Sequence, residues 1–156
     1  MAALTLGQAL EREHREIDGG IESFLDELDS GVRVDPSQLV TALESLRRHI
    51  YLEEVFLFPD LKAAGLMGPI FVMLREHGML WRQLDAVTGM LAQTSETEVL
   101  RHSCATLLAL LSDHNAKEEP IIYTQADDIL GAVASAELRK FLIQGTMPEG
   151  WVCSSA

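Results

Sequence analysis

Apolar side chains recur every three or four positions along most of this chain, the spacing that places them on one face of an α-helix. The pattern predicts five helical segments, at about residues 5–29, 35–62, 70–92, 97–123 and 127–144. Nowhere do apolar and polar residues alternate for long enough to indicate a β-strand. The sequence therefore predicts an all-α protein.

Helix-breaking residues lie between the periodic segments, where short connections are expected. The first segment ends at Ser30-Gly31, and the second begins at Asp35-Pro36, a capping residue followed by a proline suited to a first helical turn. The third segment follows Gly68-Pro69, and the polar run 93–96 separates it from the fourth. Four long helices with short loops are typical of an antiparallel up-down-up-down four-helix bundle, here with a short C-terminal fifth helix.

The two halves of the chain repeat a pattern of histidine and glutamate. Arg12-Glu13-His14 in the first half matches Arg75-Glu76-His77 in the second. Each is followed, after a similar interval, by a His-x-x-x-Glu-Glu run that leads into apolar residues and ends on an aromatic one, at residues 49–58 and 114–123. Packing requires leucine at regular intervals, not histidine and glutamate, so the repeat indicates a functional site.

Six residues of the repeat share a helix face with the leucines and isoleucines of the expected core. They are His14, His49, Glu53, His77, His114 and Glu118. Counted from the expected turns near residues 33 and 95, at about 1.5 Å per residue, the four histidines fall within one helical turn of the same level. Antiparallel packing then gathers them in one polar layer, where two carboxylates without a partner would be very costly and a metal removes that cost.

The composition of this ligand set indicates which metal it would hold. Four imidazoles and two carboxylates exceed the needs of one tetrahedral zinc ion. They suit two first-row ions, each with two histidines and with carboxylates bridging between them, and they favour iron, followed by manganese. Ferritin-like di-iron proteins use two Glu-x-x-His pairs, whereas this chain has only the pair Glu11 and His14.

The order of these residues resembles the hemerythrin-like HHE cation-binding domain, over about residues 6–129. The resemblance rests on His14, on His49-x-x-x-Glu53-Glu54 with Phe58-Pro59, on Glu76-His77, and on His114-x-x-x-Glu118-Glu119 with Tyr123. The pattern is closest to the hemerythrin domain of repair-of-iron-centres proteins. The resemblance implies a four-helix bundle around a non-haem di-iron centre, with two iron ions joined by an oxo or hydroxo bridge. The ligands it implies are His14, His49, Glu53, His77, His114 and Glu118.

Two positions depart from oxygen-carrying hemerythrins. Those proteins have a second histidine four residues before the one at position 77, where this chain has Met73. They also have an aspartate five residues after the last histidine, whereas here Glu118 and Glu119 occupy both candidate positions. Glu118 is preferred because it returns to the face of His114, and a local helix bulge would bring in Glu119 instead.

One histidine fewer leaves a more open coordination position, which favours a small diatomic ligand (oxygen or nitric oxide) or peroxide, in a response to oxidative or nitrosative stress. Consumption of nitric oxide or peroxide would make the protein an oxidoreductase that needs an external electron donor. The alternatives are an iron donor in iron-sulfur cluster repair, and a reversible oxygen carrier or sensor.

Several acidic and aromatic residues lie close to the expected ligands in the sequence. Glu54 and Glu119 are expected at the rim of the site or in contact with its ligands, but not as ligands themselves. Glu13 and Glu76 are expected in solvent because each points about 100° away from its neighbouring histidine. For Asp18, four residues after His14, a role in orienting a ligand and an exposed position remain equally open. His102 is expected at the surface. Met73, Trp81 and Tyr51 are expected to pack in the bundle, with the lining of a small-ligand pocket as the alternative.

Overall composition excludes several function classes. The chain has 156 residues, which suits one domain, and we expect a bundle at residues 1–145 and a tail at residues 146–156. Its net charge of −12 disfavours nucleic acid and anionic membrane surfaces as partners. Neither a signal peptide nor a membrane-spanning run is apparent, so a cytoplasmic location with reduced Cys104 and Cys153 is expected.

Overall fold

The computed structural model describes residues 2–31, 34–93 and 96–156, and all regular structure in these ranges is helical. The elements are α1 (Leu6–Asp29), α2 (Ser37–Leu52), η1 (Glu53–Leu57), α3 (Phe58–Ala63), α4 (Met67–Ala92), α5 (Thr97–Glu118), η2 (Glu119–Tyr123), α6 (Thr124–Ile129) and α7 (Ala132–Gln144). The elements η1 and η2 are single π-helical turns. The expected turns near residues 33 and 95 lie outside the described residues.

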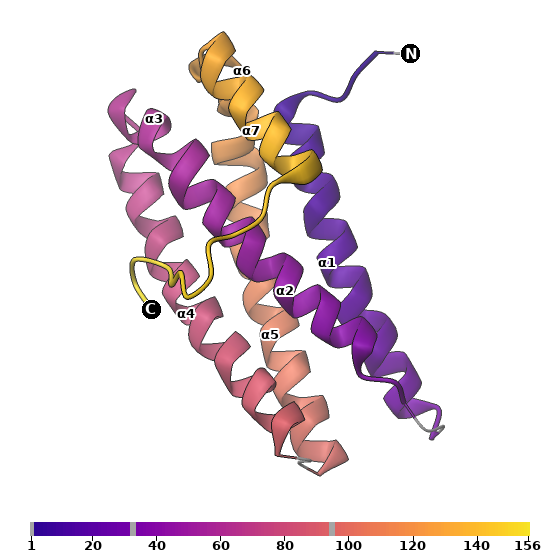
Figure 1. Ribbon diagram of the computed structural model, residues 1–156. Helices are drawn as coiled ribbons and strands as arrows, with labels where there is room; N and C mark the ends of the chain where they lie inside the picture. The colour runs from indigo at the N-terminus through magenta and orange to yellow at the C-terminus, as the bar shows by residue number, and fades with distance from the viewer. Residues whose placement is uncertain (1, 32–33, 94–95) are drawn as a thin grey trace.

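The bundle consists of four long helical rods. Two are the single helices α1 and α4. In the other two, η1 and η2 continue α2 and α5 without a break into α3 and α6 (Figure 1). The first rod, α1, packs on α2 and α5, and α4 packs on the same two neighbours. The predicted antiparallel four-helix bundle with a short fifth helix is confirmed. No helix in the described part of the chain is long and apolar enough to cross a membrane.

Three helix boundaries differ from the prediction. Helix α4 begins at Met67, so Gly68-Pro69 lie in its first turn, where a proline costs no backbone hydrogen bond. The fourth rod continues through α6 to Ile129, and the chain leaves helical geometry at Leu130, so the fifth helix begins at Ala132 instead of Asp127. The start of α2 also differs, because its N-cap is Pro36 and not Asp35, although Asp35 Oδ1 still accepts the backbone N–H of Ser37 at 2.9 Å.

Two apolar clusters fill the bundle, one toward each end, and a layer of buried polar side chains separates them. Helix α1 illustrates the arrangement: Leu10 belongs to one cluster, Ile17 to the other, and the buried His14 lies between them. The polar layer is therefore sealed from the two ends of the bundle by hydrophobic packing.

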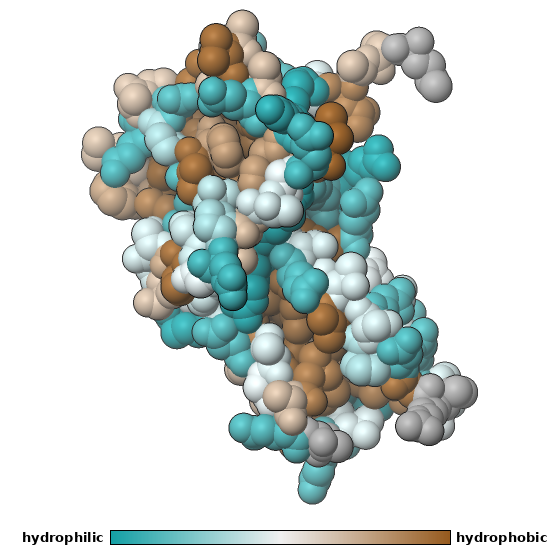
Figure 2. Space-filling model, in the orientation of Figure 1, coloured by the Kyte–Doolittle hydropathy of each residue, from teal (hydrophilic) through white to brown (hydrophobic). Residues whose placement is uncertain are grey.

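The C-terminal segment after α7 crosses the outer face of α2 and α4 (Figure 1). Its Trp151 ring packs edge-on against Tyr51 and Trp81, with ring centroids 5.1 and 5.5 Å apart. A side chain at Gly78 would collide with the Ser155 carbonyl oxygen, so this glycine is what lets the segment lie against α4. Cys104 and Cys153 are both buried and free. Figure 2 shows polar residues over much of this face, with apolar side chains visible between the helices toward its lower end.

Candidate metal centre

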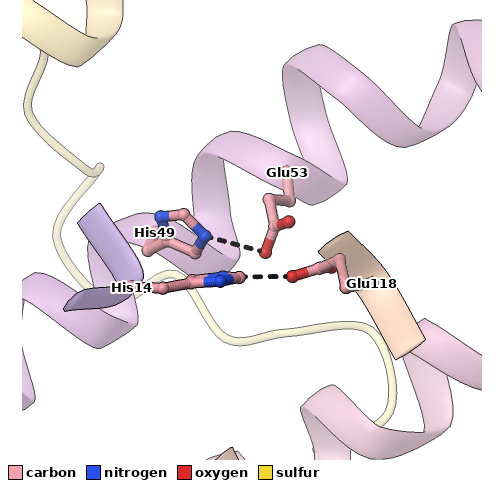
Figure 3. A group of neighbouring side chains, drawn as sticks. All are labelled: His14, His49, Glu53 and Glu118. Atoms are coloured by element: carbon pink, nitrogen blue, oxygen red, sulfur yellow. Dashed lines mark ion pairs between the residues drawn. The ribbon is translucent and has the colours of Figure 1, made fainter. Parts of the chain in front are cut away.

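The six residues singled out by the sequence repeat meet in the polar layer. Their donor atoms form two groups, each lying within 4.8 Å of one another. The first group is His14, His49, Glu53 and Glu118 (Figure 3). The second group is Glu53, His77, His114 and Glu118. All six side chains are buried, so the expectation that they face the core agrees with the geometry.

Both carboxylates are shared between the two groups. Glu53 Oε1 lies 3.3 Å from His49 Nε2 and 3.5 Å from His77 Nε2. Glu118 points Oε1 at His14 Nε2, 3.2 Å away, and Oε2 at His114 Nε2, 3.4 Å away. Two histidine pairs joined by two carboxylates are consistent with a binuclear metal site.

Several donor atoms in this layer lack a hydrogen-bond partner among the described residues. They are Glu53 Oε1, His77 Nε2 and Glu118 Oε2, and all three belong to the second group. A buried polar atom without a partner costs roughly 1–3 kcal/mol, so three together would be a severe penalty. A cation coordinated by these lone pairs satisfies all of them, and the donor set therefore fits a bound metal.

A second ring of carboxylates surrounds the histidines, and each carboxylate belongs to a neighbouring helix. Each Nδ1 atom has such a partner: Glu119 for His14, Glu13 for His49, Glu54 for His77 and Glu76 for His114, at 3.3, 2.8, 2.7 and 3.0 Å. The contacts join α1 to α2, η1 to α4, α4 to α5, and η2 to α1. With Nδ1 engaged, every Nε2 is directed at the centre, as in metal sites whose histidines are oriented by an outer carboxylate.

This ring corrects the expectation for Glu13 and Glu76, which are not solvated side chains. Each does point away from the histidine beside it in sequence, but that direction faces the next helix of the bundle. Arg48 holds Glu13 in place at 3.2 Å, and Lys117 holds Glu76. Glu54 and Glu119 lie outside the inner groups, as expected for the rim.

Comparison with family models matches the hemerythrin HHE cation binding domain over residues 5–126, which contain both histidine–glutamate groups. The chain belongs to this hemerythrin HHE family. The curated relatives include "Iron-sulfur cluster repair protein YtfE" from Yersinia pestis (strain Pestoides F) and from Yersinia pseudotuberculosis (serotype O:1b, strain IP 31758). Each is 35% identical over 82 residues, which is 51% of this chain and 36% of the relative. The alignment thus spans about a third of these relatives. No solved structure gives a significant match.

A tyrosine hydroxyl that the sequence pattern does not point to lies in the centre of this hemerythrin-type site. Tyr123 is buried, and its hydroxyl oxygen contacts every member of the first group. The π turn η2 aims it inward, because an i→i+5 turn brings Tyr123 over Glu118, whereas in a regular α-helix it would lie about 140° around. The bulge considered for Glu119 is thus present, but it brings in Tyr123, and the Glu119 side chain stays 31% exposed.

A small cavity lies on the side of the layer toward the α1–α2 connection. The volume open to water inside it is about 10 Å³, enough for about one water molecule. Its walls combine the histidines with apolar side chains and two polar ones, Asp18 and Asn115. Asp18 Oδ1 and Asn115 Oδ1 are both buried without a hydrogen-bond partner among the described residues. Met73 and Trp81 pack in the apolar clusters, as the packing interpretation expected, and His102 is exposed.

The electrostatics of the metal-free layer separate its two inner carboxylates. Burial, together with the neighbouring charge of Glu118, raises the pKa of Glu53 well above its usual range. Burial also acts to raise the pKa of Glu118, but His114 and His14 outweigh it and hold that pKa well below the usual range. In the metal-free layer the surroundings therefore favour the protonated form of Glu53 and the ionised form of Glu118.

Replacing Glu13 with glutamine should weaken cation binding about 10–100-fold, the usual effect of losing an outer partner of a metal-bound histidine. Glutamine keeps the shape of the side chain but is a weaker acceptor for His49 Nδ1. Competition with a chelator measures the affinity, and Glu44→Gln, an exposed position on α2, is the control. Equal affinities for both variants and the unaltered protein would contradict a role for Glu13 in orienting His49.

Proposed function

We propose that this protein holds two iron ions in a non-haem di-iron centre. The proposed ligands are His14, His49, Glu53, His77, His114 and Glu118. The observation that carries the proposal is the sharing of Glu53 and Glu118 between two histidine pairs, since one cation needs only one such pair. Mixed imidazole and carboxylate ligation suits iron better than calcium or magnesium, which prefer oxygen ligands alone.

Bound iron would supply a redox-active Lewis acid able to bind a small ligand. The chain's own contribution is to hold the histidines by their outer carboxylates, and to exclude bulk water with the two apolar clusters. The cavity, with room for about one water molecule, supports a very small ligand over an organic substrate. Its apolar wall, formed by side chains such as Leu46, Ile50 and Leu80, suits a diatomic gas.

The function that follows is binding of oxygen, nitric oxide or peroxide under oxidative or nitrosative stress. Asp18 and Asn115 support this choice because both line the cavity with an unpaired oxygen that can accept a hydrogen bond from a ligand, and the Asp18 carboxylate can also accept a proton. Consumption of peroxide or nitric oxide would make the protein an oxidoreductase supplied by an external electron donor.

Iron donation to damaged iron-sulfur clusters is the second candidate. It is favoured by the alignment of half of this chain with relatives named as iron-sulfur cluster repair proteins. It requires iron to leave a layer whose six inner side chains are all buried, and hence an opening of the bundle. Release of iron to an acceptor apoprotein, faster than release to a chelator alone, would support this candidate.

The deciding experiment loads the protein with ferrous iron without oxygen and adds oxygen, nitric oxide or peroxide to separate samples. We expect rapid spectral change and turnover with peroxide or nitric oxide, because one histidine fewer leaves the iron more open. A stable oxygenated form that releases its oxygen under vacuum, without turnover, would favour the carrier function instead. Binding of one zinc ion, or of no metal, would overturn the di-iron proposal itself.

A further inference from the structure

The hydroxyl of Tyr123 is within hydrogen-bond distance of all four members of one ligand group. Its oxygen lies 2.9 Å from Nε2 of both His14 and His49. It also lies 2.8 Å from Glu53 Oε2 and 3.0 Å from Glu118 Oε1. The approach of α1 to this π turn depends on Gly7, where a Cβ atom would lie 2.7 Å from the Tyr123 carbonyl oxygen.

These four contacts cannot all be hydrogen bonds. The Nδ1 atoms of His14 and His49 each face an outer carboxylate, so the ring proton resides on Nδ1 and Nε2 presents a lone pair. The two inner carboxylates present lone pairs as well. The phenol has one proton, so it can donate a hydrogen bond to only one of these four atoms, and the remaining contacts bring lone pairs together. A cation among these atoms removes the repulsion.

The distances suit a shared cation. With metal–ligand bonds of about 2.1 Å, neighbouring donor atoms of an octahedron lie about 3.0 Å apart. All four distances from the Tyr123 oxygen, 2.8 to 3.0 Å, match this edge length. Such equal distances are expected when one ligand atom of an octahedron is adjacent to four other ligand atoms. We propose that Tyr123 is a fifth protein ligand of the cation held by His14 and His49, and that it makes the two metal positions unequal.

The internal repeat supports this inequality. Tyr123 follows Glu118 by five residues and ends the π turn η2, whereas the residue five after Glu53 is Phe58, which follows the π turn η1 as the first residue of α3. Phe58 stacks on the His77 ring with centroids 5.3 Å apart and has no donor atom to offer. The cation of His77 and His114 therefore has four protein ligands against five for its partner, and the open position for a small ligand is assigned to it.

The inference rests on the proposed di-iron centre. It includes one chemical step, in which the O–H bond of Tyr123 is replaced by a bond to iron with no transfer of electrons. As the Tyr123 oxygen bonds to ferric iron, its O–H bond breaks and the proton passes to solvent water. A phenolate bound to ferric iron absorbs visible light, and excitation into that band enhances the ring vibrations of the bound tyrosine alone. This signature is independent of any reaction that the centre carries out.

The test is to load the protein with ferrous iron, oxidise it with ferricyanide, and record iron content, visible absorption and resonance Raman spectra. The chain has two tyrosines, and the second, Tyr51, packs against Phe141 and Trp151 outside the ligand groups. We expect Tyr51→Phe to keep the band with its phenolate vibrations, and Tyr123→Phe to lose both. Because Tyr51→Phe leaves Tyr123 as the sole phenol, its spectrum assigns the ligand even if Tyr123→Phe does not fold.

The outcomes separate this inference from the proposed function. Iron-loaded protein without phenolate vibrations would overturn the role of Tyr123 and leave the di-iron centre standing. Phenolate vibrations that persist in Tyr123→Phe and vanish in Tyr51→Phe would overturn it as well. Failure of the unaltered protein to bind iron would instead refute the proposed function.

Discussion

Alanine at His49 or at His114 should lower the iron content from two ions per chain to one or none, with the helix content unchanged. Each substitution removes one of only two imidazoles from a ligand group. The affinity at that position should fall by more than about 100-fold, because even the loss of an outer partner costs 10–100-fold. Metal analysis after gel filtration measures the iron content, and far-ultraviolet circular dichroism measures the helix content.

The matched control for this experiment is His102→Ala. His102 is exposed on α5, the helix that carries His114, so its loss should change neither the iron content nor the fold. Full iron occupancy in both His49→Ala and His114→Ala would mean that the inner ligands have been assigned to the wrong residues.

The bundle and the six inward-facing residues were predictable because helical periodicity is a property of the chain itself. His14 lies four residues after Leu10 and three before Ile17, so a helix that buries the two apolar residues must bury the histidine too. The number of residues between each histidine and the expected turn then gave its height along the bundle. The four heights are nearly equal, so in straight helices the histidines lie in one layer.

Features that depend on contacts between helices, or on a local change of helix type, could not be predicted from the periodicity of one helix. Glu13 and Glu76 were expected in solvent because they leave the face of their own helix, but in a four-helix ring that direction meets the next helix. Tyr123 was missed for a different reason. Its inward orientation depends on a π turn, which shifts the helical phase by one residue and leaves no mark in the apolar pattern.

Removal of the metal should lower the melting temperature of the protein. A ligand at 100 times its dissociation constant stabilises the fold by about 2.7 kcal/mol per site, and 1 kcal/mol shifts the melting temperature of a chain this size by about 2–4 °C. Each bound ion should therefore add at least about 5 °C. Calorimetry with ferrous iron under anaerobic conditions, with and without chelator, measures the shift, and magnesium at the same concentration is the control.

This stabilisation should grow as the pH rises above 4.5, the ordinary pKa of Glu53. Burial and the charge of Glu118 raise the pKa of Glu53 in the metal-free fold, so the contribution of its retained proton to stability is complete below pH 4.5 and is lost as the pH rises through the raised pKa. In the metal-bound fold the cation takes the place of that proton, and this loss does not occur. The difference between the two melting temperatures should therefore widen with pH, and a constant difference would show that Glu53 is not the group that exchanges its proton for the metal.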